Sequence, residues 1–237
     1  MPTLPQSKRG KGTLSPRLSA VADGLGAGGT VCDVGSDHGY LALFLLQRKL
    51  FSRAIVTDIR SMPLRRAQKT LEDAGFKECV TALLCDGIAE TLAHTPEAFA
   101  IAGMGAETIV GILSRVAGNI KEHTVFSLQP MTHPEALRRF LYENGFCIEQ
   151  ETLVWEGEKP YLIFRAIYDG RVRLHDSLFY EIGAFLPRQK TKSVAAYFHY
   201  LLRRVNTRLA GKNQAGIDTS YEKRLQALLQ ATLKECV

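Results

Sequence analysis

The chain has 237 residues, a formal net charge of +6 and five cysteines. It is long enough for one sizeable domain plus an appendage, and it has no apolar run of about 18 residues, so we expect no membrane span. We also expect no signal peptide, because the N-terminus lacks an apolar core. The cysteines are odd in number and form no C-x-x-C pair, which argues against a disulfide framework or a zinc site and predicts a cytoplasmic protein without a metal.

The positive charge is concentrated at the two ends of the chain. Residues 1–17 carry +4 and residues 171–237 carry +7, so the stretch between them carries −5. Basic ends on a mildly acidic body favour a phosphate-rich partner such as a nucleic acid, although ordinary surface charge for solubility would give the same pattern.

The first 25 residues predict an arm followed by a helix. Residues 1–13 are polar and basic with two prolines, and we expect a disordered arm there. Ser15 as N-cap and Pro16 at the first helical position predict a helix that ends in the glycines of 26–29. Arg17 lies in its first turn, where the helix dipole does not favour a cation, so it is a candidate contact residue; the alternative is a solvated surface arginine.

The strand predicted at residues 30–34 leads into a loop rich in glycine and acid. Its candidate cofactor-binding residues are Asp33, Gly35, Asp37 and His38. The spacing is not the G-x-G-x-x-G of a dinucleotide site, and carboxylates would repel a pyrophosphate. They suit the cationic sulfonium and ammonium of S-adenosylmethionine, so the loop predicts a site for that cofactor. The alternative is a core strand that merely ends in a glycine turn.

Acidic residues also follow the next two predicted strands. Asp58 ends the strand at 53–58 and can accept both ribose hydroxyls of an adenosine; the alternative is an N-cap for the helix predicted at 62–74. Asp86 and Gly87 follow the strand at 80–85, where the acid can accept from the adenine amine; the alternative is a plain Asp-Gly turn. Together with Asp33, these acids at three successive strand tips favour a ligand site.

The chain from residue 99 to residue 168 continues the alternation of strand and helix. A strand at 99–102 runs into Gly103, Met104 and Gly105, whose backbone can pass close to the cofactor's methyl group. After a helix at 107–116, the strand at 124–128 ends in Gln129 and Pro130. The helix at 134–144 is predicted to bury Leu137 and Leu141, with Arg138 and Arg139 outside.

Two final strands, at 147–155 and 161–168, predict an antiparallel hairpin. The fold class is therefore α/β, with a doubly wound, mostly parallel sheet and an antiparallel hairpin at one edge. This Rossmann-like arrangement is the usual architecture of class I methyltransferases that use S-adenosylmethionine.

The C-terminal stretch predicts a separate helical unit. Apolar stripes at helical spacing run over residues 194–209 and 221–233, and the glycines at 211 and 216 mark a break between them. We expect an antiparallel, coiled-coil-like hairpin whose outward arginines, Arg203 and Arg204 among them, can touch RNA. The predicted domains are the arm (1–13), the catalytic domain (14–170) and the helical domain (171–237).

Five motifs together resemble the bacterial TrmK family of tRNA (adenine(22)-N1)-methyltransferases. They are Leu14-Ser15-x-Arg17-Leu18, Asp33-x-Gly35-Ser36-Asp37-His38-Gly39-Tyr40-Leu41, Ile101-Ala102-Gly103-Met104-Gly105, Leu128-Gln129-Pro130 and Glu181-Ile182-Gly183. The resemblance implies that the helical tail helps to hold tRNA. It also implies cofactor contacts from Asp33, Gly35, His38, Asp58, Asp86, Gly87, Gly103, Met104 and Gly105. To the tRNA substrate we assign Arg17, Gln129, Pro130, Arg203 and Arg204.

Adenine N1 has an in-plane lone pair, so it can attack the cofactor's methyl group directly, with no metal and no covalent intermediate. Asp37 is the catalytic candidate, because a carboxylate there can stabilise the charge that develops on the base or accept a proton from its amine; the alternative is a cap for the helix near Tyr40. His38 is expected to contact the cofactor or the turn. The chain lacks the [DN]-P-P-[YF] motif of N6-adenine enzymes and a Pro-Cys dipeptide for pyrimidine C5 chemistry.

Two other functions compete with this hypothesis. One is a methyltransferase of the same fold that acts on a small molecule, since fold does not determine substrate; the basic tail argues against it. The other is a non-catalytic RNA-binding protein, for which the acids at the strand tips would have no use. We expect a monomer.

Overall fold

The computed structural model describes residues 13–116 and 118–235. The arm predicted at residues 1–13 therefore lies, apart from Thr13, outside the described residues. Within those residues, no helix has the length and apolar character needed to cross a membrane.

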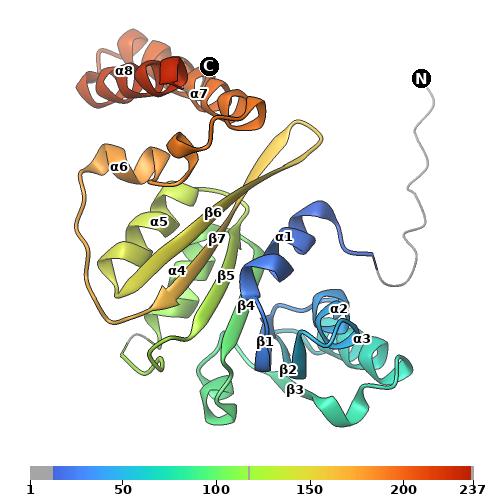
Figure 1. Cartoon of the computed structure of the whole chain (residues 1–237). Helices are drawn as coiled ribbons and strands as arrows, with labels where there is room; N and C mark the ends of the chain where they lie inside the picture. Colours follow the sequence, from blue (N-terminus) through green and yellow to red (C-terminus); the bar gives the residue numbers. More distant parts are fainter. Residues whose placement is uncertain (1–12, 117, 236–237) are drawn as a thin grey trace, which may run out of the picture.

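A seven-stranded sheet forms the centre of the molecule (Figure 1). Its strand order is β3-β2-β1-β4-β5-β7-β6. The strands are β1 (Gly28–Val34), β2 (Phe51–Asp58), β3 (Val80–Leu84), β4 (Ala98–Met104), β5 (Val125–Pro130), β6 (Phe146–Glu156) and β7 (Lys159–Tyr168). Strands β1 to β5 pair in parallel, and β7 is antiparallel to both β5 and β6. The predicted parallel sheet with an antiparallel hairpin at one edge is confirmed.

Helices cover both faces of this sheet (Figure 1). One face carries α1, α2 and α3, and the other carries α4 and α5. Their bounds are α1 (Pro16–Leu25), α2 (Tyr40–Gln47), α3 (Ser61–Asp73), α4 (Ala106–Ser114) and α5 (Pro134–Glu143), with short 3-10 turns at Lys77–Cys79, Glu90–His94 and Leu186–Arg188. The start of α1 is as predicted, because the Ser15 hydroxyl accepts a hydrogen bond from the Leu18 amide at 3.3 Å.

The core beneath α4 and α5 contains an aromatic cluster. Phe99 and Phe126 stack with their ring centroids 5.1 Å apart, and Phe146 meets Phe126 edge-on at 5.3 Å. All three side chains are fully buried and come from β4, β5 and β6. They join the parallel strands to the antiparallel edge, so the hairpin is part of the same core.

Arg138 does not face solvent, which contradicts the sequence prediction. Its side chain is fully buried, and Nε donates to Oε1 of the equally buried Glu151 at 2.7 Å. Its guanidinium also donates to the carbonyl of Tyr180. The sequence pattern failed here because helical spacing alone does not reveal that an acid on β6 pairs with the arginine.

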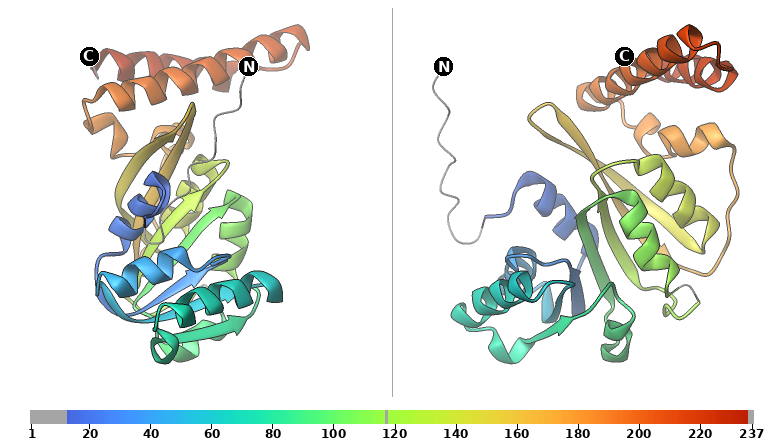
Figure 2. Two further views of the ribbon diagram at one scale, coloured as in Figure 1. Left: turned by 90° about the vertical axis from the view of Figure 1, so that its right-hand side faces the viewer. Right: turned by 180° about the vertical axis from the view of Figure 1, so that it is seen from behind.

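The C-terminal helices lie beyond the hairpin, on one side of the sheet (Figure 2). They are α6 (Ser177–Ile182), which the sequence did not predict, α7 (Lys192–Gln214) and α8 (Ser220–Glu235). Helix α7 continues through Gly211, contrary to the predicted break, and ends only after Gln214. Trp155 Nε1 on β6 donates to Ser193 Oγ on α7 at 3.1 Å and so attaches this unit to the hairpin. Within the unit, the Tyr221 hydroxyl of α8 donates to Glu181 of α6 at 2.8 Å.

Candidate active site

Two adjoining cavities lie at the carboxyl ends of the central parallel strands. Their volumes are about 400 Å³ and about 280 Å³. The residues that line both are Val34, Gly35, Asp37, Ala102 and Gly103, from the ends of β1 and β4. The strand order reverses between β1 and β4, and this switch point is where open α/β sheets bind ligands. We call the larger cavity the strand-tip cavity and the smaller the loop cavity.

The loop after β1 follows a tightly curved path. Gly35 has φ 71° and Asp37 has φ 45°, a left-handed conformation that glycine and aspartate tolerate better than most residues. The backbone amides of Gly35 and Ser36 both donate to the carbonyl of Thr57, at 2.8 and 3.0 Å. A Cβ at position 35 would run into the Met104 methyl group, so the glycine lets the loops after β1 and β4 approach each other.

Asp33 is buried at the end of β1, beside the loop cavity. Burial raises the pKa of its carboxyl group to about 7, although hydrogen bonds from Ser36 and from the backbone of Ala42 act in the opposite direction. No cation among the described residues forms an ion pair with it. A buried carboxylate of this kind is suited to a cationic group on a ligand.

The other two predicted acids, Asp58 and Asp86, line the strand-tip cavity together with Gly87 and Met104. Asp58 is buried and accepts from the Arg60 amide at 2.8 Å, just before α3 begins. The predicted helix-cap alternative is wrong, because the N-cap of α3 is Arg60 and no side chain caps that helix. The second carboxylate oxygen of Asp58 accepts no hydrogen bond that the structure records.

Asp86 is more exposed, and Arg115 holds both of its carboxylate oxygens, at 2.6 and 3.3 Å. This pairing lowers the pKa of Asp86. The carboxylate of Asp86 therefore lines the cavity while it is paired with an arginine. The sequence did not indicate this pair, because Arg115 lies 29 positions away.

Apolar residues of the strand-tip cavity were missed by the sequence interpretation. Ile59, which directly follows Asp58, lines the cavity although 65 % of its surface is exposed. Ile112 lines it from α4. Such surfaces suit the faces of a planar heterocycle. A large apolar residue in the polar stretch Asp58-Ile59-Arg60 was the signal that could have revealed Ile59.

Asp37 lies at the boundary of both cavities and is half exposed. Its Oδ1 accepts from Arg66 Nη2 at 3.0 Å, and its Oδ2 lies 3.5 Å from His38 Nε2. The helix-cap alternative is wrong, because the N-cap of α2 is Gly39 and no side chain caps that helix. His38 lines the loop cavity and stacks on Tyr40, with ring centroids 5.3 Å apart.

Arg17 and Gln129 are not arranged as surface contacts for a large substrate. Arg17 lines the loop cavity, and its Nη1 donates to Gln129 Oε1 at 2.8 Å. Gln129 is fully buried: its Oε1 also accepts from the Gly103 amide at 3.0 Å, and its Nε2 donates to the Pro130 carbonyl at 2.7 Å. The assignment of Gln129 to the substrate is wrong, because internal hydrogen bonds occupy its amide and the residue is shielded from solvent.

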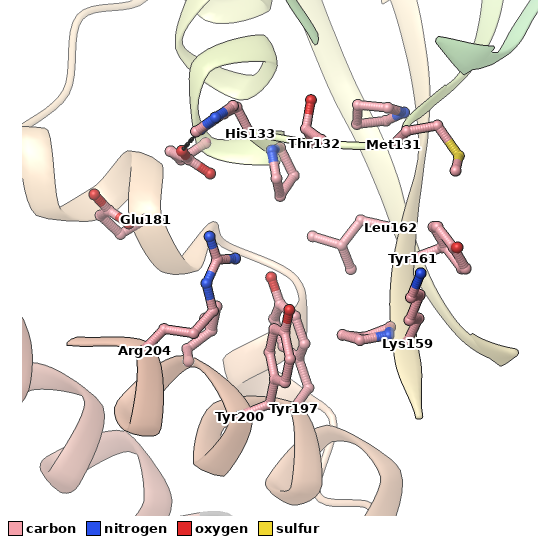
Figure 3. A pocket seen from close by; sticks show the side chains of 15 residues that line it. Met131, Thr132, His133, Lys159, Tyr161, Leu162, Glu181, Tyr197, Tyr200 and Arg204 are labelled. Carbon is pink, nitrogen blue, oxygen red and sulfur yellow. Dashed lines mark hydrogen bonds and ion pairs between the residues drawn. The ribbon is translucent and has the colours of Figure 1, made fainter. Parts of the chain in front are cut away.

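The remaining predicted residues lie outside the two cavities. Gly105 is the N-cap of α4 and lines neither of them. Pro130 and Arg204 line a third, larger cavity between the sheet and α7 (Figure 3). Arg203 is exposed on α7 and does not line that cavity.

The loop cavity and the strand-tip cavity fit S-adenosylmethionine as a pair. The loop cavity offers a buried carboxylate and an arginine to an amino-acid group, and the strand-tip cavity offers Asp58 and apolar walls to a nucleoside. Neither cavity holds a cluster of cations that would favour a pyrophosphate. In the part of the chain that the structure describes, no group of three or more potential metal ligands is found.

Comparisons with known proteins agree with this arrangement. Residues 14–164 match a family model described as a methyltransferase domain. A curated relative from Bacillus subtilis, named tRNA (adenine(22)-N(1))-methyltransferase, is 28% identical over 75% of this chain and 76% of its own length. The crystal structure of the B. subtilis M1A22 tRNA methyltransferase TrmK is 26% identical, with a TM-score of 0.78 over 95% of this chain and 97% of that one.

A Streptococcus pneumoniae protein solved in complex with S-adenosyl-L-methionine is 27% identical, with a TM-score of 0.80 over 93% of this chain and all of that one. These similarities extend well beyond the sheet. The resemblance to TrmK proteins and the predicted cofactor are therefore confirmed.

Proposed function

The chain belongs to the methyltransferase domain family, and from this premise we propose that it transfers the methyl group of S-adenosylmethionine to N1 of adenine 22 in tRNA. The observation that carries the proposal is the set of acids around the two adjoining cavities, in a chain similar over three quarters of its length to an enzyme named for that reaction. A small-molecule methyltransferase would share the cavities but would not need the basic α7.

We assign the two ends of the cofactor to the two cavities. Asp33 pairs with its ammonium group and Arg17 with its carboxylate, since both line the loop cavity. Asp58 accepts the ribose hydroxyls, and Ile59 covers one face of the adenine. Assigning Arg17 to the cofactor replaces the earlier assignment of this residue to tRNA.

When bound, the cofactor supplies an electrophilic methyl group on a cationic sulfonium. The N1 lone pair forms the new C–N bond as the S–C bond breaks, so the positive charge moves to the adenine. Asp37 borders both cavities and is the carboxylate that stabilises this charge or accepts a proton from the exocyclic amine. Arg66 is a positioning residue, because its ion pair fixes one oxygen of Asp37 and leaves the other for the base.

The substrate has to present a base that is normally stacked or paired in folded tRNA. Turning such a base out costs a few kcal/mol, which phosphate contacts elsewhere on the protein can offset. Arg203, Arg204 and Arg208 lie on α7, on the hairpin side of the molecule. A tRNA substrate implies action in the cytoplasm, and we propose that a single chain performs it.

The test is methyl transfer from labelled S-adenosylmethionine to unmodified tRNA, followed by nucleoside analysis, for the wild type and Asp37→Asn. We expect label in 1-methyladenine, and at least a hundredfold lower kcat in the variant. Label at another nucleoside would contradict the proposed reaction. No label in RNA, with cofactor binding intact by calorimetry, would favour the small-molecule alternative.

A further inference from the structure

A third cavity, of about 530 Å³, lies between the sheet and α7. Figure 3 shows side chains around it from the loop after β5, the β6–β7 hairpin, α6 and α7. It shares no lining residue with either cofactor cavity. We call it the outer cavity. Its volume falls in the range of about 300–1,000 Å³ that is usual for small-ligand sites.

The walls of the outer cavity combine aromatic rings with cations. Tyr161 comes from the hairpin, and Tyr197 and Tyr200 come from α7 with ring centroids 6.5 Å apart and nearly parallel planes. Lys159 and Arg204 stand at opposite sides, and the Arg204 guanidinium lies 5.7 Å from the centre of the Tyr200 ring. Sites for a single-stranded nucleotide usually combine aromatic rings that stack on a base with cations that bind a phosphate.

Polar groups in the same cavity are suited to the edge of a base. Glu135 and Glu181 supply acceptors, and Thr132 supplies a hydroxyl. His133 also lines the cavity, and its Nδ1 lies 3.0 Å from Glu135 Oε1, which orients the ring. Acceptors within a cavity that also holds two cations favour a ligand with both donors and negative charge, and a nucleotide has both.

We propose that the outer cavity binds one unstacked nucleotide of the tRNA, next to the adenine that is methylated. This inference rests on the proposed function, since it assumes a tRNA substrate. It assigns to the cavity a base stacked on Tyr200, with the phosphates on the two sides of that nucleotide held by Lys159 and by Arg204.

The position of the cavity explains why it takes a neighbour and not the reacting adenine. Arg17 stands between the two regions: it lines the loop cavity, and its Nη1 lies 3.0 Å from the sulfur of Met131 in the outer cavity. Its guanidinium also covers the Tyr161 ring at 5.2 Å. The Met131 amide in turn donates to the Met104 carbonyl at 2.7 Å. The outer cavity and the loop cavity therefore adjoin through Arg17, which lines the loop cavity and contacts two residues that line the outer cavity.

The first experiment compares Tyr200→Ala with Tyr200→Phe and with a matched control, His199→Ala. His199 is the preceding residue of α7, is exposed and does not line the cavity. Stacking of one base is worth about 1–3 kcal/mol, so we expect the KM for tRNA to rise about 5- to 150-fold in Tyr200→Ala. We expect Tyr200→Phe and His199→Ala to stay within about twofold of the wild type, and kcat and the Kd for S-adenosylmethionine to stay unchanged in all three.

The second experiment identifies the bound nucleotide. Binding of tRNAs with a single abasic position on either side of adenine 22 is measured for the wild type and Tyr200→Ala. At the occupied position, loss of the base should weaken binding to the wild type about 5- to 150-fold and leave binding to Tyr200→Ala nearly unchanged.

Two results would overturn the inference. One is a Tyr200→Ala enzyme with wild-type KM for tRNA. The other is additive loss at every abasic position, which would mean that no base meets this ring. Both differ from failure of the proposed function, in which the wild type itself transfers no methyl group to any tRNA.

Discussion

The guanidinium of Arg66 donates to the carboxylate of Asp37 at 3.0 Å, although Arg66 belongs to α3 and Asp37 to the loop after β1. Both side chains are about half exposed. The ion pair occupies Oδ1 only, and the nearest group to Oδ2 is the ring of His38, at 3.5 Å. The proposed catalytic carboxylate therefore has one oxygen held by the protein and the other directed toward an exposed histidine.

We expect Arg66→Gln to lower kcat about two- to fivefold, because an exposed ion pair is worth up to about 1 kcal/mol. The adjacent exposed Arg65→Gln is the matched control and should change nothing. A purely structural role would lower the melting temperature as well, so unfolding is measured in parallel. In the double variant with Asp37→Asn, Arg66→Gln should cause no further loss; an additive loss would show that Arg66 acts independently of Asp37.

Asp33 should make cofactor binding depend on pH. Its pKa is raised to about 7 by burial, so below pH 7 the free protein carries a neutral carboxyl group there, and an ammonium group must first displace that proton. We expect the Kd for S-adenosylmethionine, measured by calorimetry, to rise toward tenfold per unit as pH falls below 7 and to level off above it.

Asp33→Asn is the control for that profile. It should bind the cofactor more weakly at pH 8, and the dependence on pH should disappear. A raised pKa in the folded state contributes stability that is present below the unfolded value of about 4 and is lost as pH rises through 7. The variant should therefore be more stable than the ligand-free wild type at pH 8. A profile in Asp33→Asn that still follows the wild type would assign the titration to another group.

The sequence could predict those site residues whose positions follow from the order of strands and loops along the backbone. Asp33 and Asp58 each end an apolar run in a chain that alternates strand and helix, and parallel strands bring such ends to one edge. Gly35 and Gly103 mark the loops after β1 and β4 because only short, permissive residues fit there. Local pattern and topology are sufficient for these positions.

The residues that were misassigned depend on partners far away in sequence. Arg138 is buried because Glu151 on β6 pairs with it, and Gln129 is buried because Gly103 and Arg17 hydrogen-bond to it. Neither pairing leaves a periodic signal. Gly211 lies within α7, and the next residue, Lys212, forms an ion pair with Glu222 on α8 at 2.7 Å. Such a tertiary contact outweighs the low helix propensity of one glycine.

Glu151→Gln is expected to destabilise the protein by about 3–5 kcal/mol, because it leaves the buried Arg138 without its countercharge. Replacing both residues, as Arg138→Met with Glu151→Leu, should recover most of the loss, since a buried pair is often no better than apolar residues of similar volume. Denaturant unfolding measures both. If the double variant is as unstable as the single one, the bond from Arg138 to the Tyr180 carbonyl dominates instead.

Gly183→Ala should cause a comparable loss through the same pair. Gly183 has φ 72°, and an added Cβ would lie 2.6 Å from Glu151 Oε1 and 2.7 Å from Arg138 Nε. The methyl group would have to displace fully buried charged atoms, so we expect a fall in the free energy of unfolding of several kcal/mol. Gly216→Ala is the control: its φ of 66° is also positive, but nothing lies within 4 Å of an added Cβ. An equal loss in both variants would attribute the effect to backbone conformation alone.

Charge reversal on α7 should separate tRNA binding from cofactor binding. We expect Arg203→Glu with Arg204→Glu to raise the Kd for tRNA more than tenfold and to leave the Kd for S-adenosylmethionine unchanged, because both arginines lie outside the cofactor cavities. Lys121→Glu, a reversal at an exposed residue in the loop that leads into β5, is the control for net charge.

The neutral single variants distinguish the two arginines. Each phosphate contact that is lost should reduce the slope of log Kd against log salt by a little less than one. Arg204→Gln should do so and also raise the Kd at high salt, because Arg204 lines the outer cavity and lies against Tyr200, whereas Arg203→Gln should change only the slope. If both variants change the slope equally and leave the Kd at high salt unaffected, α7 acts as a basic surface without a specific contact at Arg204.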